Sequence, residues 1–228
     1  MKTLIIGDIH GCHDELLALL DKAGMAEDDP IIALGDLVNR GPHSDKTLDF
    51  FRQNAIPNLQ SIMGNHEQRH IQAILGETRP TVSTLYTRWQ LGDAYNEAVA
   101  YMESLPAYLD LPDALIVHAY FEPNVALEDQ NPDVLIGGKG AETYLRERYD
   151  RPWYEYYDGD KPLIVGHRDW TGTMQPFIHR ERVYGIDTRC VYGGSLTGMI
   201  LPDMTFVSVP AKRDHFAKFR KRYVNDAD

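Results

Sequence analysis

Six side chains that can bind a metal ion lie at the ends of five separate apolar runs of the chain. They are two aspartates, one asparagine and three histidines: Asp8, His10, Asp36, Asn65, His118 and His167. This mixture of carboxylate, amide and imidazole groups suits Mn, Fe or Zn and differs from a thiolate site. Two divalent cations held close together can activate a water molecule and clamp a phosphoryl group. The residue types therefore indicate a binuclear metal centre.

The apolar runs before these residues predict the strands that must position them. The runs are short and rich in leucine and β-branched side chains, at residues 4–6, 31–34, 59–63, 115–117 and 163–165. In open α/β sheets a ligand binds beyond the carboxyl ends of the strands, which is where the six side chains fall. A glycine precedes four of the six and would let the chain approach an ion closely.

Each of these residues, taken alone, has an ordinary explanation. Asp and Asn often end strands because they form turns, and a single histidine is usually a core or surface residue. The repetition of metal-binding groups after five strands favours one shared centre over five independent turns.

The same residues belong to longer motifs that resemble those of a known family. The motifs are GDIHG at 7–11, GDLVNRGP at 35–42, GNHE at 64–67, HA at 118–119, GH at 166–167 and DT at 187–188. Together they are similar to the phosphoprotein-phosphatase branch of the calcineurin-like metallophosphoesterases. Within it the chain most resembles bacterial and bacteriophage lambda-type protein serine/threonine phosphatases. The bacterial symmetrical diadenosine tetraphosphate hydrolases share much of the pattern, including the run from Asp187 to Thr197.

The resemblance implies two divalent metal ions, with manganese expected first and Fe, Zn or Ni as alternatives. By this resemblance Asp8 and His10 would bind one ion, and Asn65, His118 and His167 the other. Asp36 would bridge both ions. A bridging carboxylate is sensible because two cations roughly 3.5–4 Å apart repel each other. Water held between them would lose a proton readily and attack phosphorus in line.

By the same resemblance, His66 is the general acid that protonates the departing oxygen. A positioned proton donor typically contributes about 10²–10⁴-fold to a rate; the alternative is that His66 only donates a hydrogen bond beside the site. Asn39 stands where many relatives carry an aspartate that orients this histidine. Because an amide adds no negative charge to favour imidazolium, we expect His66 to be a weaker base here than in those relatives.

Arginines are expected to bind the substrate phosphate. A planar guanidinium can hold two phosphate oxygens at once, and Arg40 and Arg146 match the arginines of the family, with Arg148 as an alternative to Arg146. Asn65 and Tyr120 are also expected to contact substrate. Tyr120 stands where large relatives have glycine, so the mouth of the site would be narrower or more aromatic.

Hydrophobic periodicity predicts the remaining elements. We expect helices over 13–22, 44–53 and 68–75, one or two helices over 86–104, and further strands over 182–186, 195–201 and 205–210. Early strand–helix alternation followed by late strands predicts an α/β (α+β) fold of mixed sheets flanked by helices. The resemblance implies the four-layer metallophosphoesterase sandwich. We expect one domain over residues 1–210 and a basic tail over 211–228.

The segment 121–160 carries two features that these motifs do not explain. The glycine-rich run at 137–140 lacks the lysine–serine/threonine ending of a nucleotide P-loop. The aromatic cluster at 153–157 could stack a base or grip a peptide, although packing under a long loop is the expectation. Arg168, directly after His167, either adds positive charge for an anionic substrate or faces solvent.

Composition limits the partners. The 228 residues are 43% apolar, which is enough to fill a core, and the net charge of −11 disfavours nucleic acid, which needs a basic surface. Asp169 stands where DNA-processing relatives carry a second histidine, which also argues against a nuclease. The exception is Lys212–Tyr223, with six basic residues, expected to be a solvated helix or else a dock for an acidic partner.

From the residues after Met1 we expect no signal peptide, and from the length of the apolar runs we expect no membrane span. Cys12 and Cys190 are too few for a disulfide framework, so we expect a reducing cytoplasm. The chain gives no basis for predicting an oligomeric state.

The expected function is that of a metal-dependent phosphoester hydrolase. A protein serine/threonine phosphatase acting on phosphorylated protein or peptide is the first expectation. The alternative is a symmetrical diadenosine tetraphosphate hydrolase acting on a nucleotide-type phosphoester. From another class, the chain could be a non-catalytic metal-binding interaction module, although His66 and Arg40 would then serve no purpose.

Overall fold

A five-stranded mixed sheet, sheet A, carries the first three site motifs. The structure is a computed structural model that describes residues 1–224, so residues 225–228 of the expected basic tail lie outside the described residues. The strand order in sheet A is β10-β9-β1-β2-β3. Its strands are β1 (Thr3–Ile6), β2 (Ile31–Ala33), β3 (Leu59–Ser61), β9 (Ser195–Leu201) and β10 (Thr205–Pro210). The first three are parallel, and β9 runs antiparallel to both β1 and β10.

A second five-stranded sheet, sheet B, carries the other two motifs. Its order is β4-β5-β6-β8-β7. Its strands are β4 (Tyr108–Asp110), β5 (Leu115–Val117), β6 (Leu163–Val165), β7 (Phe177–His179) and β8 (Val183–Gly185). The central strands β5, β6 and β8 are parallel, and the two edge strands are antiparallel to their neighbours.

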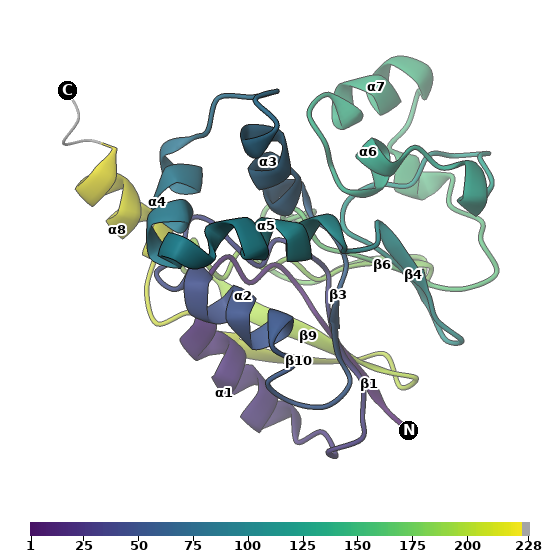
Figure 1. The fold of residues 1–228 in the computed structure, drawn as a ribbon. Helices are drawn as coiled ribbons and strands as arrows, with labels where there is room; N and C mark the ends of the chain where they lie inside the picture. Colours follow the sequence, from purple (N-terminus) through teal and green to yellow (C-terminus); the bar gives the residue numbers. More distant parts are fainter. Residues whose placement is uncertain (225–228) are drawn as a thin grey trace.

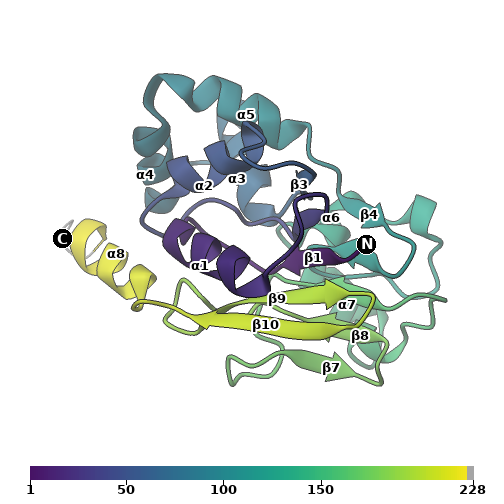
Figure 2. The same ribbon diagram turned by 90° about the horizontal axis from the view of Figure 1, so that it is seen from below.

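Strand alternation packs the two sheets face to face. Ile5 and Ile32 of sheet A lie in one buried cluster with Ile116 and Ile164 of sheet B. Because successive side chains of a strand point to opposite faces, residues one step away, such as Leu4, face the helices instead. The helices α1 to α5 lie on the outer side of sheet A, and β7 and β8 of sheet B lie on the other side of β9 and β10 (Figure 2).

Five helices cover sheet A and two short ones accompany sheet B (Figure 1). The first group is α1 (His13–Ala23), α2 (Ser44–Arg52), α3 (Asn65–Ile74), α4 (Val82–Leu91) and α5 (Tyr95–Glu103). The second is α6 (Pro132–Leu135) and α7 (Ala141–Arg148), and α8 (His215–Tyr223) follows β10. Single turns of 3₁₀ helix cover Gly92–Ala94, Leu127–Asp129 and Trp153–Glu155. Within residues 1–224, no helix is both long and apolar enough to cross a membrane.

The predicted fold class, two mixed sheets flanked by helices, is confirmed. Two predicted helices have different bounds. The helix expected over 68–75 begins at Asn65, because the Glu67 side chain accepts the backbone N–H of Gly64 and closes the first turn. The stretch 86–104, expected to form one or two helices, forms two, which part at Gly92, where φ is 52°. A side-chain cap by Thr81 starts the first of them earlier than predicted.

Candidate metal centre and the pockets beside it

All six predicted ligands meet where the carboxyl ends of the strands of both sheets come together. Four follow strands of sheet A: Asp8 and His10 after β1, Asp36 after β2, and Asn65 after β3. The other two, His118 and His167, follow β5 and β6 of sheet B. All but His167 are buried, and His167 is partly buried. The centre therefore joins the two sheets.

Asp36 lies in the middle of this cluster. Its Oδ2 is 3.5 Å from Nε2 of His10, and its Oδ1 is 3.5 Å from Nε2 of His118. It belongs both to a group with Asp8 and His118 and to a group with His10 and His66, and in each group the possible ligand atoms lie within 4.8 Å of one another. A carboxylate so placed can share its two oxygens between neighbouring cations. The division of the other ligands between two ions stays a prediction, because Asp8 lies 3.9 Å from its predicted partner His10 and also groups with His118 of the other set.

One feature of the cluster fits a positive charge. Oδ2 of Asp8 is buried and accepts no hydrogen bond within the part of the chain that the structure describes. The Asn65 amide lies between Oδ2 of Asp36, at 3.2 Å, and the Arg69 guanidinium, at 3.0 Å; with its nitrogen toward Asp36 it donates to the carboxylate and accepts from Arg69. Turned the other way, its oxygen faces the same side of the cluster as the Asp36 carboxylate, and both could then bind one cation. The donor set therefore fits a metal ion.

Burial keeps two of the imidazoles neutral. Desolvation, and next the Arg40 charge, lower the pKa of His10 to about 3. Desolvation, and next His118, lower the pKa of His167 to about 3. For His118 burial acts in the same direction, but the Asp36 carboxylate outweighs it and raises the pKa to about 10. Neutral imidazole is the form that binds a metal.

The backbone is strained at the centre. His10, Asp36, Asn39, Arg40 and His167 all have φ between 48° and 72°. Each such non-glycine residue costs on the order of 1–3 kcal/mol, and such residues concentrate at functional sites. Two of the predicted glycines are needed for close approach: a Cβ at Gly64 would collide with Oδ1 of Asp36, and one at Gly166 with Oδ1 of Asp8.

Glu67 holds the strained turn that carries Asp36. Its Oε2 accepts the backbone N–H of Asp36 at 2.8 Å and of Gly64 at 2.9 Å, and its Oε1 accepts that of Leu37 at 2.9 Å. The side chain is fully buried. The place of Glu67 in the GNHE motif is the only signal in the sequence for this supporting role, which the motif alone does not specify.

His66 lies at the end of a buried hydrogen-bond network. Oδ1 of Asn39 accepts from Thr87 at 2.9 Å and contacts Nε2 of His70 at 3.1 Å, which leaves Nδ2 of Asn39 facing Nδ1 of His66 at 3.0 Å. In this arrangement Nδ1 of His66 accepts from the Asn39 amide. Asn39 thus occupies the predicted place beside the histidine.

Two arginines and a further aspartate surround the centre. Nη1 of Arg40 is 2.7 Å from Nε2 of His10, so Arg40 reaches the centre, as the sequence analysis expected. Arg69, which the sequence analysis missed, has Nη1 3.3 Å from Nε2 of His66. Asp187, quoted earlier only within the DT motif, is buried, and after burial it is the main group that raises the pKa of Asp8.

Arg146 is not among these contacts. It is exposed on α7, and within residues 1–224 none of its polar contacts reaches the six ligands. It lines a cavity beside the centre instead. The guanidinium of Arg148, the alternative, lies 3.8 Å from the centre of the Tyr144 ring.

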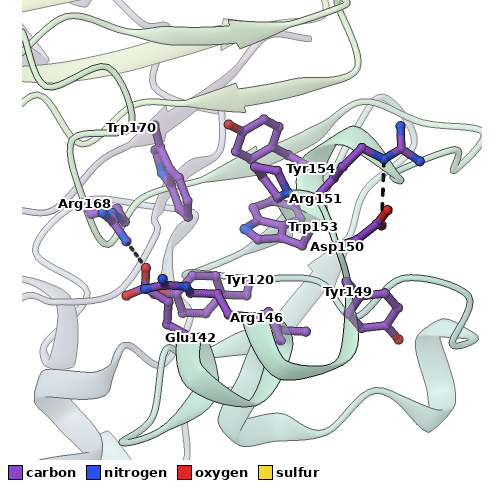
Figure 3. Close-up of a pocket in the computed structure, with 12 residues that line it drawn as sticks. Tyr120, Glu142, Arg146, Tyr149, Asp150, Arg151, Trp153, Tyr154, Arg168 and Trp170 are labelled. Atoms are coloured by element: carbon purple, nitrogen blue, oxygen red, sulfur yellow. Dashed lines mark hydrogen bonds and ion pairs between the residues drawn. The ribbon is translucent and has the colours of Figure 1, made fainter.

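The cavity that Arg146 lines has a volume of about 430 Å³ and an aromatic wall (Figure 3). We call it the aromatic pocket; its rings are those of Tyr120, Tyr149, Trp153, Tyr154 and Trp170. The Tyr120 ring lies 5.4 Å from the ring of His167, so the pocket adjoins the centre. Arg168 lies at its edge, where it pairs with Glu142 at 2.8 Å and lies over Trp170 at 5.3 Å. Of the predicted aromatic cluster at 153–157, Trp153, Tyr154 and Tyr157 pack on the core of sheet B, as expected. Trp153 and Tyr154 also line the aromatic pocket.

A second cavity, of about 330 Å³, lies between α8 and the loop after Asp36. We call it the basic cleft. It is lined by five Lys and Arg side chains, Arg40, Lys212, Arg213, Lys218 and Arg222, together with His43 and His215. Asp14 is its one acidic lining residue among the described part of the chain, and it pairs with Lys212 at 2.7 Å.

Comparisons with known proteins agree with this geometry. The family model described as calcineurin-like phosphoesterase matches residues 1–197. The asymmetrical bis(5'-nucleosyl)-tetraphosphatase PrpE of Geobacillus thermodenitrificans is 32% identical over 247 residues, covering 96% of this chain and 99% of that protein. The PrpE of Anoxybacillus flavithermus is 31% identical over 245 residues, covering 95% and 97%.

Solved structures share the fold. A candidate diadenosine tetraphosphatase superposes with a TM-score of 0.74 at 24% identity, covering 92% of this chain and 93% of that chain. A metallophosphoesterase from Sphaerobacter thermophilus gives a TM-score of 0.60 at 22% identity, covering 97% and 93%. At these identities the likeness speaks for the architecture alone.

Proposed function

Since the chain belongs to the calcineurin-like phosphoesterase family and is a metal-dependent phosphoester hydrolase, we propose that it cleaves a dinucleoside tetraphosphate asymmetrically, into a nucleoside monophosphate and a nucleoside triphosphate. The relatives named above support the nucleotide alternative over the protein serine/threonine phosphatase that the sequence analysis placed first. Their names also specify asymmetrical cleavage, where the sequence analysis had expected symmetrical cleavage.

The aromatic pocket is the observation that carries this proposal. A nucleobase can stack on any aromatic face, and each such contact is worth about 1–3 kcal/mol. The pocket presents the rings of Tyr120, Tyr154 and Trp170 within one cavity, and the Tyr120 ring lies against that of His167. The three arginines that line it, Arg146, Arg151 and Arg168, could bind the phosphates or the ribose of the same nucleotide. A phosphoserine side chain would leave this cavity empty.

In the proposed mechanism the six predicted ligands would hold two divalent metal ions, which would supply an activated water and a clamp on the reacting phosphoryl group. Arg40, already beside His10, is placed to bind a phosphoryl oxygen. His66 is placed to protonate the departing oxygen through Nε2, and Asn39 orients its ring through Nδ1. Arg69 lies 3.3 Å from the same Nε2, where its positive charge favours release of the proton.

Asn39 suits an anhydride substrate better than a serine ester. The amide provides no negative charge to favour imidazolium. A smaller fraction of His66 is therefore in the protonated form that can act as the acid. The leaving group of an anhydride is a phosphate oxygen with a pKa near 6, whereas a serine alkoxide is a far stronger base. An anhydride therefore needs much less help from the acid.

A substrate comparison tests the proposal. With Mn²⁺ present, we expect kcat/KM for diadenosine tetraphosphate to exceed that for phosphoserine peptides by at least about a hundredfold, with AMP and ATP as products on chromatography. Tyr154→Ala should lower kcat/KM for the dinucleotide about tenfold relative to glycerol phosphate, which has no base. Tyr156→Ala, the same change on a half-buried tyrosine outside the pocket, is the control. Faster turnover of phosphopeptides would refute the proposal.

A further inference from the structure

The basic cleft lies across the metal centre from the aromatic pocket. Helix α7, which lines the aromatic pocket, and helix α8, which lines the basic cleft, are at opposite ends of the molecule in both ribbon views (Figures 1 and 2). Each cavity reaches the centre through one side chain. Tyr120 lies against His167 on one side, and Arg40 contacts His10 on the other. Each cavity therefore has one lining residue that contacts a predicted metal ligand.

The cleft concentrates positive charge on an otherwise acidic protein. The chain has a net charge of −11, and 5 of its 23 lysines and arginines line this one cavity of about 330 Å³. Clefts lined by one sign of charge attract counter-ions strongly. Guanidinium and ammonium groups at such spacing match the oxygens of a phosphate chain.

The basic face of α8 is held in place. His215, Lys218 and Arg222 recur every three or four residues, so they lie on the same face of the helix. Behind them, Phe219 is buried, with its ring 5.3 Å from that of Tyr86 on α4. Arg220 and Lys221 belong to the same helix but do not line the cleft.

The base of α8 is tied to α1 as well. Oε1 of Glu15 accepts from Nε2 of His215 at 2.8 Å and from the backbone N–H of Lys212 at 2.9 Å. A merely solvated tail has no need of a buried carboxylate. The cationic groups of the cleft thus stand on a fixed support, which is what preorganised binding of an anion requires.

We propose that the basic cleft binds the part of the phosphate chain that leaves with the triphosphate product, while the nucleoside of the monophosphate product occupies the aromatic pocket. This inference rests on the function proposed above and adds the direction in which the substrate lies. One ribose separates a base from its α-phosphorus, so a base in the aromatic pocket brings the α-phosphorus to the centre. The β, γ and δ phosphates then extend past Arg40 into the cleft.

This orientation explains asymmetrical cleavage. The water oxygen bonds to the α-phosphorus as the bond from that phosphorus to the α–β bridging oxygen breaks. The electron pair stays on the bridging oxygen, which takes a proton from the imidazolium form of His66. The attacking water keeps one hydrogen in the new P–OH group and releases the other to solvent, from which His66 regains its proton. The products are a nucleoside monophosphate in the aromatic pocket and a nucleoside triphosphate in the cleft. Symmetrical cleavage would require two phosphates on each side, which the unequal charge of the two cavities disfavours.

A pair of double variants on one helix tests the inference. Lys218→Glu/Arg222→Glu reverses two charges that line the cleft, and Arg220→Glu/Lys221→Glu makes the same change on residues that do not line it. We expect only the first to lower the ratio of kcat/KM for diadenosine tetraphosphate to kcat/KM for glycerol phosphate, by roughly tenfold or more. The effect should shrink in high salt, which screens exposed charges. Circular dichroism and Tm establish that both variants fold.

A binding measurement separates this inference from the proposed function. Calorimetry of inorganic tripolyphosphate with the metal-free protein should show at least tenfold weaker binding for the Lys218/Arg222 variant than for the Arg220/Lys221 variant. If the wild type fails to split the dinucleotide but this difference appears, the proposed function fails and the anion site stands. If the wild type splits it and the two double variants behave alike in both measurements, the cleft is not the phosphate site.

Discussion

Asn39 is the residue that decides how His66 is held. An aspartate at this position would accept a hydrogen bond from Nδ1–H of His66 and stabilise imidazolium by its charge. We expect Asn39→Asp to raise the pKa of His66, so that the limb of the pH–rate profile that His66 governs moves to higher pH by about one unit. The contacts of Thr87 and His70 with Oδ1 can persist, since a carboxylate also accepts from them. Superimposable profiles of kcat/KM against pH would discard this role.

Glu67 is predicted to be a positioning residue. In Glu67→Gln, one amide N–H₂ would face backbone N–H groups that now donate to a carboxylate oxygen. We expect a loss of about 2–3 kcal/mol in the free energy of unfolding, or roughly 5–10 °C in Tm, and weaker Mn²⁺ binding by calorimetry. Glu147→Gln on exposed α7 is the control. Equal stability of the two variants would show that Glu67 does not hold the Asp36 turn.

At the scale of elements, the attachment of α8 to α1 should depend on pH. Burial opposes ionisation of Glu15, but the hydrogen bonds from His215 and from the Lys212 backbone outweigh it and lower the pKa of Glu15. A lowered pKa in the folded state means that the carboxylate stabilises the fold above its ordinary pKa of about 4.3 and that this contribution disappears as the pH falls through the folded value.

We therefore expect Glu15→Gln to lower Tm at pH 6, by the equivalent of about 1–2 kcal/mol, and to have little effect at pH 3. The measurement is a thermal melt of both proteins across this range, with Glu27→Gln on the exposed surface as the control. A difference in Tm that stays constant from pH 6 to pH 3 would contradict the assignment.

At the scale of the whole molecule, removal of the metal should weaken the packing of sheet A against sheet B. Sheet A and sheet B both contribute predicted ligands, and Asp8 and Asp36 are buried carboxylates that repel each other without a cation. At a free metal concentration of 100 Kd, binding stabilises the folded state by about 2.7 kcal/mol. We expect EDTA to abolish turnover and lower Tm by roughly 5–10 °C, and Mn²⁺ to restore both. Asp36→Asn should melt at the same temperature with and without Mn²⁺; a wild type equally insensitive to metal would count against the centre.

The sequence alone determined the strands and the groups at their ends. Metal-binding residues after short apolar runs are a local pattern, because a buried strand and the turn that follows it are encoded within about ten residues. That pattern, with the motifs around it, was enough to predict the two mixed sheets and to select the six side chains that the structure brings together. It also placed Arg40 and His66 correctly beside them.

Only the tertiary structure decided what surrounds the centre. Arg69 and Asp187 reach it because segments far apart in the sequence fold against each other. The aromatic pocket joins side chains from Tyr120 to Trp170, and the basic cleft joins Asp14 to Tyr223. Such cavities depend on how helices and loops pack over the sheets, and no short stretch of sequence specifies that packing. The sequence by itself therefore predicted metal-dependent phosphoester hydrolysis. The packing of distant segments forms the cavities in which a substrate must bind.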